Sequence, residues 1–226
     1  MTAPPPAVIK TRPSGSNWLP REDLATLTPE ILSQRTTALT PLLAAHAREA
    51  ERLRHPVDPV WQAIRQTGVF YHFVPKTYGG LQFDAESFID IMLPLAKGCA
   101  STGWVTSFCV EHNWMLTLFP KEAQDETFGG AFPYIIAPGV TTPPGTLTPV
   151  KGGYQLSGHW KWGTGVMHAD WVLAAAAVAD GASPPDVRFC LVPVSAVTVL
   201  DTWHVDGMTG TGSNDIVADC VFVPEH

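Results

Sequence analysis

Apolar and polar positions follow a helical period in the first half of the chain. Between residues 42 and 54 the leucines and alanines fall on one side and the charged residues on the other, which predicts an amphipathic helix. An apolar stripe over residues 85–97 and a strongly apolar segment over 104–119 predict two longer helices. The small residues between them, 98–103, predict a break. Shorter helices are expected from Thr28-Pro29-Glu30, a typical capped start, and over residues 58–67 and 120–128.

From about residue 130 the pattern changes to short runs rich in β-branched residues, punctuated by proline and glycine. Helices followed by strands predict an α+β fold, in which an all-α helical domain over 28–129 precedes an antiparallel β-barrel or sheet domain over 130–226. Residues 1–27 are rich in proline, serine and threonine, which predicts a flexible arm. The strands are expected over residues 134–137, 153–158, 171–178, 187–193, 197–203 and 216–223.

Composition narrows the classes of protein to which the chain can belong. Because 45% of its 226 residues are hydrophobic and only 15% are charged, either the core is rich in aromatic residues or part of the surface is covered by another domain or subunit. The net charge of −7 argues against a nucleic-acid partner, which needs a concentrated basic face. The four cysteines have neither CxxC nor Cys/His metal spacing, so we expect free thiols and no metal.

The sequence also bears on location. The longest apolar run, residues 171–179, is too short to cross a bilayer. The N-terminal residues lack the apolar core of a signal peptide. We therefore expect a cytoplasmic protein with no membrane partner.

The strongest candidate for ligand contact is the segment LSGHWKWGTGVMHADW, residues 156–171. Small residues between tryptophans let a backbone approach a flat ligand without an intervening side chain. Thr164, within Gly163-Thr164-Gly165, places a lone hydroxyl where that approach is closest. The same spacing is compatible with a tryptophan-rich strand that contains a glycine bulge.

Two further segments could carry chemistry, and each has a structural alternative. The glycine- and hydroxyl-rich loop over residues 203–215 could form a nest of amide donors for an anion, or it could be a mobile turn. His112 shares a helical face with Phe108, Met115 and Phe119. Spacing alone favours a core histidine there, and the alternative is a contact with a polar substrate group. Neither GxGxxG nor GxxxxGK occurs, so a Rossmann or P-loop site is not supported.

Several motifs occur in a fixed order over roughly residues 30–226, and together they are far more specific than any one of them. They resemble the flavin-dependent monooxygenases built on the acyl-CoA dehydrogenase fold. These are the oxygenase components of two-component systems such as p-hydroxyphenylacetate and steroid-phenol hydroxylases and the dibenzothiophene oxygenase. The motifs are Tyr78-Gly79-Gly80, Cys99 to Val105, His112-Asn113-Trp114, Ser157-Gly158-x-Trp160 through Trp171, Gly207 through Gly210-Thr211-Gly212-Ser213-Asn214-Asp215, and Val221 to His226.

The resemblance implies a role for each candidate residue. The hydroxyl of Thr164 would bond flavin N5 and hold the C4a-hydroperoxide, which makes Thr164 catalytic. His112 would line the substrate pocket and take part in catalysis, and Trp203 would also lie near the substrate. The residues that would bind the flavin are Trp162, Gly163, Thr164, Gly165 and Ser213.

The implied reaction is hydroxylation of an aromatic, polycyclic or heteroatom-containing small molecule with O₂ and reduced FMN or FAD, which a partner flavin reductase supplies. In that family a C-terminal four-helix bundle follows the β-domain and provides the histidine base and part of the flavin and tetramer contacts. This chain stops where the bundle would begin, so a natural end and a fragment are both open.

Two other functions are also open. An acyl-CoA dehydrogenase usually has Trp-Ile-Thr-Asn where this chain has Trp162-Gly163-Thr164-Gly165, which favours the monooxygenase. A non-catalytic fragment, or a subunit that needs a partner for the missing bundle, is the third hypothesis.

Overall fold

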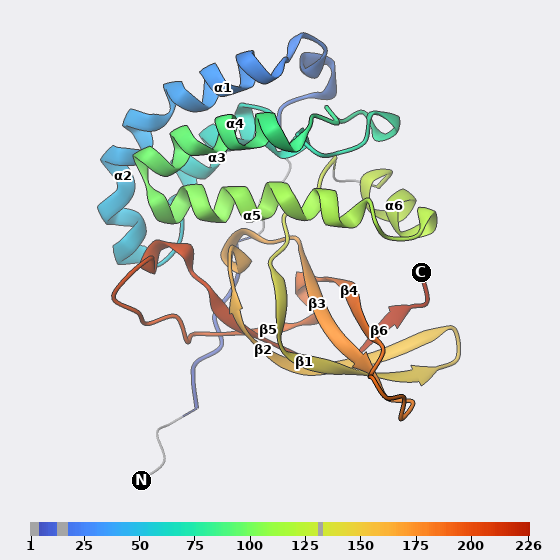
Figure 1. The fold of residues 1–226 in the computed structure, drawn as a ribbon. Helices are drawn as coiled ribbons and strands as arrows, with labels where there is room; N and C mark the ends of the chain where they lie inside the picture. The colour runs from blue at the N-terminus through green and yellow to red at the C-terminus, as the bar shows by residue number, and fades with distance from the viewer. Residues whose placement is uncertain (1–4, 13–17, 131–132) are drawn as a thin grey trace. The chain divides into compact units, whose positions relative to one another are not determined.

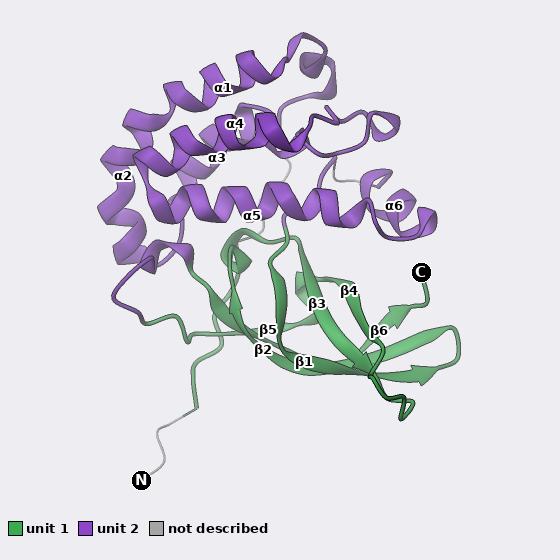
Figure 2. Cartoon of the chain, in the orientation of Figure 1, with its two compact units in different colours: residues 1–13, 137–204, 212–226 green, residues 14–136, 205–211 purple. Residues whose placement is uncertain are grey.

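The computed structural model describes residues 5–12, 18–130 and 133–226, and these form two compact units (Figures 1 and 2). The helical unit comprises residues 14–136 and 205–211, and the β unit comprises residues 1–13, 137–204 and 212–226. Helices precede strands along the chain, which confirms the predicted α+β class. Among the helices of the described residues, none combines the length and the hydropathy that a membrane span requires.

Side chains cap the first turn of two helices in the helical unit, Pro29–Ala38 and Ala85–Gly98. The Thr28 hydroxyl accepts the Ile31 N–H at 3.3 Å, and the Asp84 carboxylate accepts the Ser87 N–H at 2.8 Å, so each satisfies a backbone donor of the first turn. The α-helices are α1 (Pro29–Ala38), α2 (Thr40–Leu53), α3 (Asp58–Gln66), α4 (Ala85–Gly98), α5 (Ala100–Leu116) and α6 (Lys121–Phe128). Short 3₁₀ turns cover Arg21–Thr26, Val69–Tyr71 and Lys76–Tyr78.

The predicted break over residues 98–103 is wrong, because α5 already begins at Ala100 and only Cys99 separates it from α4. Gly103 lies inside α5 and packs against α4. A Cβ at this position would lie 2.6 Å from the backbone N and Cα of Ala96, which no side chain tolerates. The small residues therefore reflect close packing of two helices and not a loop.

Aromatic side chains fill the centre of the helical unit. Tyr134 stacks on Phe70 with ring centroids 5.3 Å apart and meets Tyr71 edge-on at 5.0 Å. The buried Arg65 guanidinium donates to the Tyr134 hydroxyl at 2.9 Å. Tyr134 thus belongs to the helical core, and the strand predicted over residues 134–137 does not form.

The β unit contains one six-stranded sheet with the order β4-β3-β1-β2-β6-β5. Strands β1 and β3 run parallel and the other neighbours run antiparallel, so the sheet is mixed and not purely antiparallel. The sequence did not indicate β1, because Pro143 and Pro144 interrupt it; the register shifts between Val140 and Gly145. The strands are β1 (Gly139–Val150), β2 (Gly153–Gly163), β3 (Trp171–Val178), β4 (Val187–Pro193), β5 (Thr198–Leu200) and β6 (Asn214–Pro224).

The described part of the N-terminal region pairs with the edge of this sheet. The Ile9 N–H donates to the Val199 carbonyl at 3.0 Å, and the Asp201 N–H donates to the Ala7 carbonyl at 2.7 Å. Val8 forms an isolated antiparallel bridge with Leu200. Residues 7–9 therefore cover the otherwise open edge of β5.

Trp160 anchors the core of the β unit. Its indole is fully buried, and Nε1 donates to the Ala175 carbonyl at 2.8 Å. A Cβ at Gly145 or at Gly158 would lie only 2.4 Å or 2.7 Å from the indole ring. Two glycines on neighbouring strands thus make room for the ring that holds β2 in place beneath the predicted site.

Candidate functional site

Strand β2 ends in a turn that displays Trp162. The backbone φ of Trp162 is +64°, a left-handed conformation that is uncommon for a bulky residue. The Thr164 N–H donates to the Trp162 carbonyl at 2.8 Å and closes the turn, and Gly165 follows at φ +83°. The indole of Trp162 is 62% exposed. The turn therefore presents a flat aromatic surface outside the core of the β unit.

Gly163 is required by close packing within the sheet. It pairs with Asn214 of β6, and a Cβ here would lie 2.6 Å from the Ile216 side chain and 2.9 Å from the Asn214 carbonyl. The glycine bulge considered from the sequence is thus present, because the β2–β6 register shifts between Trp160 and Gly163. The bulge and a ligand surface are compatible, since the turn that exposes Trp162 begins at the same point.

A pair of hydroxyl groups lies at the base of this turn. Thr164 Oγ1 and Ser213 Oγ are 2.9 Å apart, and either atom can be the donor. Both residues are buried, with exposed fractions of 8% and 3%. Two of the residues predicted to bind a flavin are therefore in direct contact, although 49 positions separate them in the sequence.

Asn214 holds the loop that carries Ser213. Its Oδ1 accepts the backbone N–H of Thr202 at 3.1 Å and that of Trp203 at 3.0 Å, and its Nδ2 donates to the Gly212 carbonyl at 3.2 Å. Sequence reasoning did not assign a role to Asn214, and its place in the Gly-Ser-Asn-Asp run was the available signal. The Asn214 side chain therefore links the backbone of Trp203 to that of Gly212, the residue before Ser213.

The glycine-rich loop between β5 and β6 packs onto helices over part of its length. Residues 205–211 belong to the helical unit, where Thr209–Thr211 forms a 3₁₀ turn. A Cβ at Gly210 would lie 3.1 Å from the Ser101 side chain and 3.2 Å from the backbone of Ala50. Close packing on α2 and α5 thus explains this glycine.

His112 lies in the helical unit on α5 and is 5% exposed. Its ring meets Phe108 edge-on, with centroids 5.5 Å apart, as the helical spacing predicts. The neighbouring Asn113 is fully buried and exchanges two hydrogen bonds with the backbone of Ile135, at 2.9 and 3.0 Å. The structure thus divides the predicted residues into His112 in one unit and the Trp162–Gly165, Trp203 and Ser213 group in the other.

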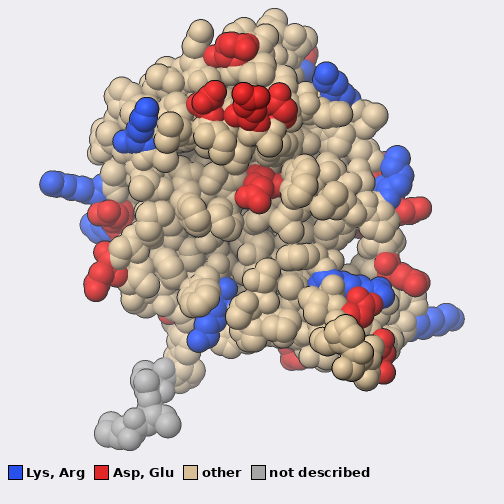
Figure 3. All heavy atoms as spheres, in the orientation of Figure 1, with Lys and Arg blue, Asp and Glu red and all other residues tan. Residues whose placement is uncertain are grey.

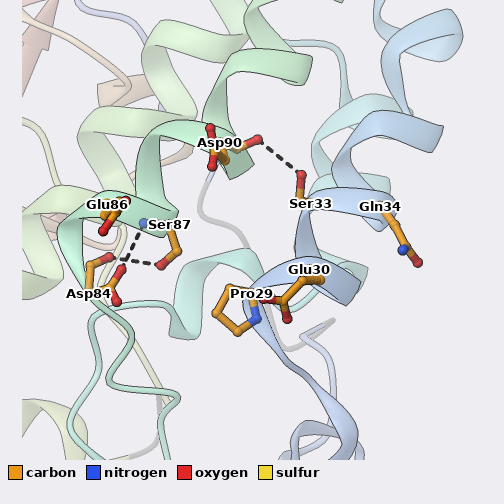
Figure 4. A pocket seen from close by; sticks show the side chains of 8 residues that line it. All are labelled: Pro29, Glu30, Ser33, Gln34, Asp84, Glu86, Ser87 and Asp90. Atoms are coloured by element: carbon orange, nitrogen blue, oxygen red, sulfur yellow. Dashed lines mark hydrogen bonds between the residues drawn. The ribbon is translucent and has the colours of Figure 1, made fainter.

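A separate pocket of about 480 Å³ lies among α1 and α4 of the helical unit (Figure 4). Four carboxylates line this pocket. On the face drawn in Figure 3, acidic side chains gather over the helices, and most of the surface is uncharged. Two of these carboxylates are engaged: Glu30 accepts from the Thr28 hydroxyl, and Asp84 caps α4 through Ser87. These hydrogen bonds lower the pKa of both groups and so stabilise both carboxylates as anions.

The residues of the β unit fit a flavin. The exposed Trp162 indole offers a stacking surface, and the hydroxyl pair offers a donor or an acceptor to a ring nitrogen. Within residues 5–12, 18–130 and 133–226, no three His, Cys, Asp or Glu side chains are grouped as a metal would require.

Comparison with known proteins identifies the fold of the chain. Residues 35–130 match the family model described as the N-terminal domain of acyl-CoA dehydrogenases. A pigment production hydroxylase from a Rhodococcus species is 40% identical over 195 residues, which cover 86% of this chain and 50% of the relative. The oxygenase subunit HsaA of a flavin-dependent monooxygenase from Rhodococcus jostii is 38% identical over 193 residues, or 85% of this chain and 50% of the relative.

Among solved structures, XiaF from a Streptomyces species, in complex with FADH2 and glycerol, is 37% identical with a TM-score of 0.81. The match covers 91% of this chain and 52% of XiaF. This chain therefore has the acyl-CoA dehydrogenase fold over the matched residues. Over the matched residues its sequence is similar to those of flavin-dependent monooxygenases with this fold, as the ordered motifs predicted. It spans about half the length of the curated relatives that it matches.

Proposed function

We propose that this chain forms part of the oxygenase component of a two-component flavin-dependent monooxygenase. It uses O₂ and a reduced flavin, delivered by a partner flavin reductase, to hydroxylate an aromatic, polycyclic or heteroatom-containing small molecule. The observation that carries the proposal is the buried Thr164–Ser213 hydroxyl pair at the foot of the exposed Trp162 indole. The names of the relatives support the same reaction class.

The β unit supplies the flavin contacts in this proposal. The bound reduced flavin supplies the electrons that activate O₂. Trp162 stacks against the flavin ring, and the Thr164 hydroxyl, held by Ser213, bonds to flavin N5. Gly163 and Gly165 give the backbone the turn that places these two side chains.

The helical unit supplies His112 for the substrate. An imidazole can donate or accept one hydrogen bond at a phenol or enol oxygen, and such a contact orients the ring to be hydroxylated. The edge-on contact with Phe108 fixes one face of the imidazole. Trp203 is proposed as a second substrate contact, with its backbone held by Asn214.

Several finer assignments complete the proposal. FMN and FAD are both candidates, and the complex of XiaF with FADH2 favours FAD. The net charge of −7 supports a small-molecule partner over nucleic acid. The described residues include all four cysteines and contain no disulfide, which suits a cytoplasmic protein. We also propose a homotetrameric assembly, as in the family that the motifs resemble.

The test supplies the purified chain with reduced FMN or FAD, O₂ and a panel of phenols and indoles. Flavin binding is measured by fluorescence quenching and hydroxylated product by mass spectrometry. We expect Thr164→Val to weaken flavin binding by no more than about tenfold, the value of one hydrogen bond, while product formed per flavin oxidised falls sharply. Thr164→Ser keeps the hydroxyl and should keep the yield.

Thr198→Val, on the exposed side of β5, is the matched control and should change neither quantity. An unchanged product yield in Thr164→Val would remove Thr164 from the mechanism. Reduction of bound FAD by an acyl-CoA thioester would instead indicate a dehydrogenase. A chain that binds neither flavin would contradict the proposal as a whole.

A further inference from the structure

We infer that Ser213 is a positioning residue that lets the Thr164 hydroxyl reverse its hydrogen bond when the bound flavin changes oxidation state. The inference rests on the proposed flavin site and adds to it a specific preference for the reduced cofactor. It assigns to Ser213 an action through Thr164 and not a direct contact with the reacting atoms.

The first step is the geometry of the pair. The two hydroxyl oxygens are 2.9 Å apart, and both residues are more than nine-tenths buried. Thr164 lies in the turn after β2, and Ser213 directly precedes β6, two strands that pair along most of their length. The Asn214 hydrogen bonds fix the backbone on either side of Ser213. The distance between the hydroxyls is therefore set by the sheet and does not depend on a mobile loop.

The second step is the chemistry of hydroxyl groups. Each hydroxyl has one proton to donate and two lone pairs with which to accept. In the pair, either Ser213 donates to Thr164 or Thr164 donates to Ser213, and the oxygen positions are the same in both cases. A simple rotation about each C–O bond exchanges the two arrangements.

Oxidised and reduced flavin require opposite hydrogen bonds from Thr164. Oxidised flavin N5 has a lone pair and accepts a hydrogen bond, whereas N5 of reduced flavin carries a hydrogen and donates one. Thr164 must donate to the oxidised ring, and it can then accept from Ser213. Thr164 must accept a hydrogen bond from the reduced ring, and its own O–H then donates a hydrogen bond to Ser213.

Ser213 therefore matters unequally for the two forms. Without its oxygen, Thr164 beside the reduced ring would keep a buried O–H with no acceptor, and an unsatisfied buried donor is costly. Beside the oxidised ring, Thr164 would lose only a donor to its second lone pair, which costs less. The pair thus favours the oxidation state that the oxygenase receives from a reductase.

The experiment measures the dissociation constants of oxidised and anaerobically reduced flavin for the full chain and its variants. We expect Ser213→Ala to weaken the binding of reduced flavin by roughly 5- to 100-fold more than the binding of oxidised flavin. This is the range that one unsatisfied buried donor predicts. Ser213→Thr keeps a hydroxyl and should restore the ratio. Ser157→Ala removes another serine hydroxyl from the same sheet and should leave the ratio unchanged.

A second background separates this role from a merely structural one. In Thr164→Val there is no hydroxyl for Ser213 to serve, so adding Ser213→Ala should no longer change the ratio. If Ser213→Ala does not fold, Ser213→Cys provides the same comparison, because a thiol is a weak acceptor of similar shape.

Equal weakening of both flavin forms by Ser213→Ala would overturn the inference and leave the proposed function intact. An undiminished effect in the Thr164→Val background would also overturn it. Binding of neither flavin form by the unmodified chain would overturn both the inference and the proposed function.

Discussion

Replacing Asn113 tests how the helical unit holds the segment that follows α6. Asn113 is fully buried on α5, next to the predicted substrate residue His112. Its Oδ1 accepts the Ile135 N–H at 2.9 Å, and its Nδ2 donates to the Ile135 carbonyl at 3.0 Å and to the Cys109 carbonyl at 2.8 Å. One side chain therefore satisfies both polar backbone groups of a residue that belongs to no helix or strand.

The variant Asn113→Leu has the same number of side-chain heavy atoms and the same branching, so it removes these bonds without opening a cavity. The N–H and C=O of Ile135 are then left buried without that partner, at a cost of about 1–3 kcal/mol each. The added apolar surface recovers part of this, about 1–2 kcal/mol. The midpoints of these ranges, about 4 kcal/mol lost and about 1.5 kcal/mol recovered, give a net loss of about 2.5 kcal/mol in the free energy of unfolding.

Urea unfolding followed by circular dichroism measures this loss directly. Glu111→Leu introduces the same side chain at an exposed position of α5 and should change stability by no more than about 0.5 kcal/mol. A loss below about 1 kcal/mol in Asn113→Leu, with the control unchanged, would refute the view that this side chain holds Ile135.

Three further predictions concern His72, Gly158 and His112. His72 is fully buried among aromatic rings, and this burial lowers its pKa. Below about pH 6.5 the unfolded state gains a proton that the folded state resists, so the free energy of unfolding falls as the pH drops. This fall should be smaller in His72→Gln, as measured by unfolding at a series of pH values. An equal pH slope in both proteins would contradict this. Gly158→Ala places a Cβ 2.7 Å from the Trp160 ring and should cost about 1–3 kcal/mol in thermal unfolding, whereas Gly207→Ala, in open space, should be neutral. His112→Ala should weaken substrate binding more than flavin binding in paired titrations, and equal losses would indicate a structural role instead.

The helices were predictable because their signals are local. Thr28 and Asp84 mark the starts of α1 and α4 by capping bonds that span three residues. Strand β1 was not predictable, because its parallel pairing with β3 bridges more than thirty residues and outweighs its three prolines. The break predicted around Gly103 was wrong for a similar reason. A glycine is needed there because the backbone of Ala96, in the neighbouring helix, leaves no room for a side chain.

The same distinction applies to the candidate site. Thr164 and Ser213 could each be singled out from an ordered set of motifs, but their mutual hydrogen bond could not, since the pairing of β2 with β6 creates it. Asn214 was missed because its partners, Thr202 and Trp203, are brought to it only by the loop that it organises. Residue types indicate which hydrogen-bonding groups are available, and the pairing of the strands determines which of these groups contact one another.

The tryptophans include a buried group and an exposed group, and one exposed member differs from the others in its backbone. Trp61 and Trp160 are buried in the cores, whereas Trp104, Trp114 and Trp162 are 47%, 48% and 62% exposed. Trp104 and Trp114 lie within α5, where ordinary helical backbone suffices to place them. Trp162 instead has a left-handed backbone, a conformation that costs of order 1–3 kcal/mol and that burial of its indole does not offset. In the proposed site, stacking of the flavin ring on the Trp162 indole would offset part of this cost.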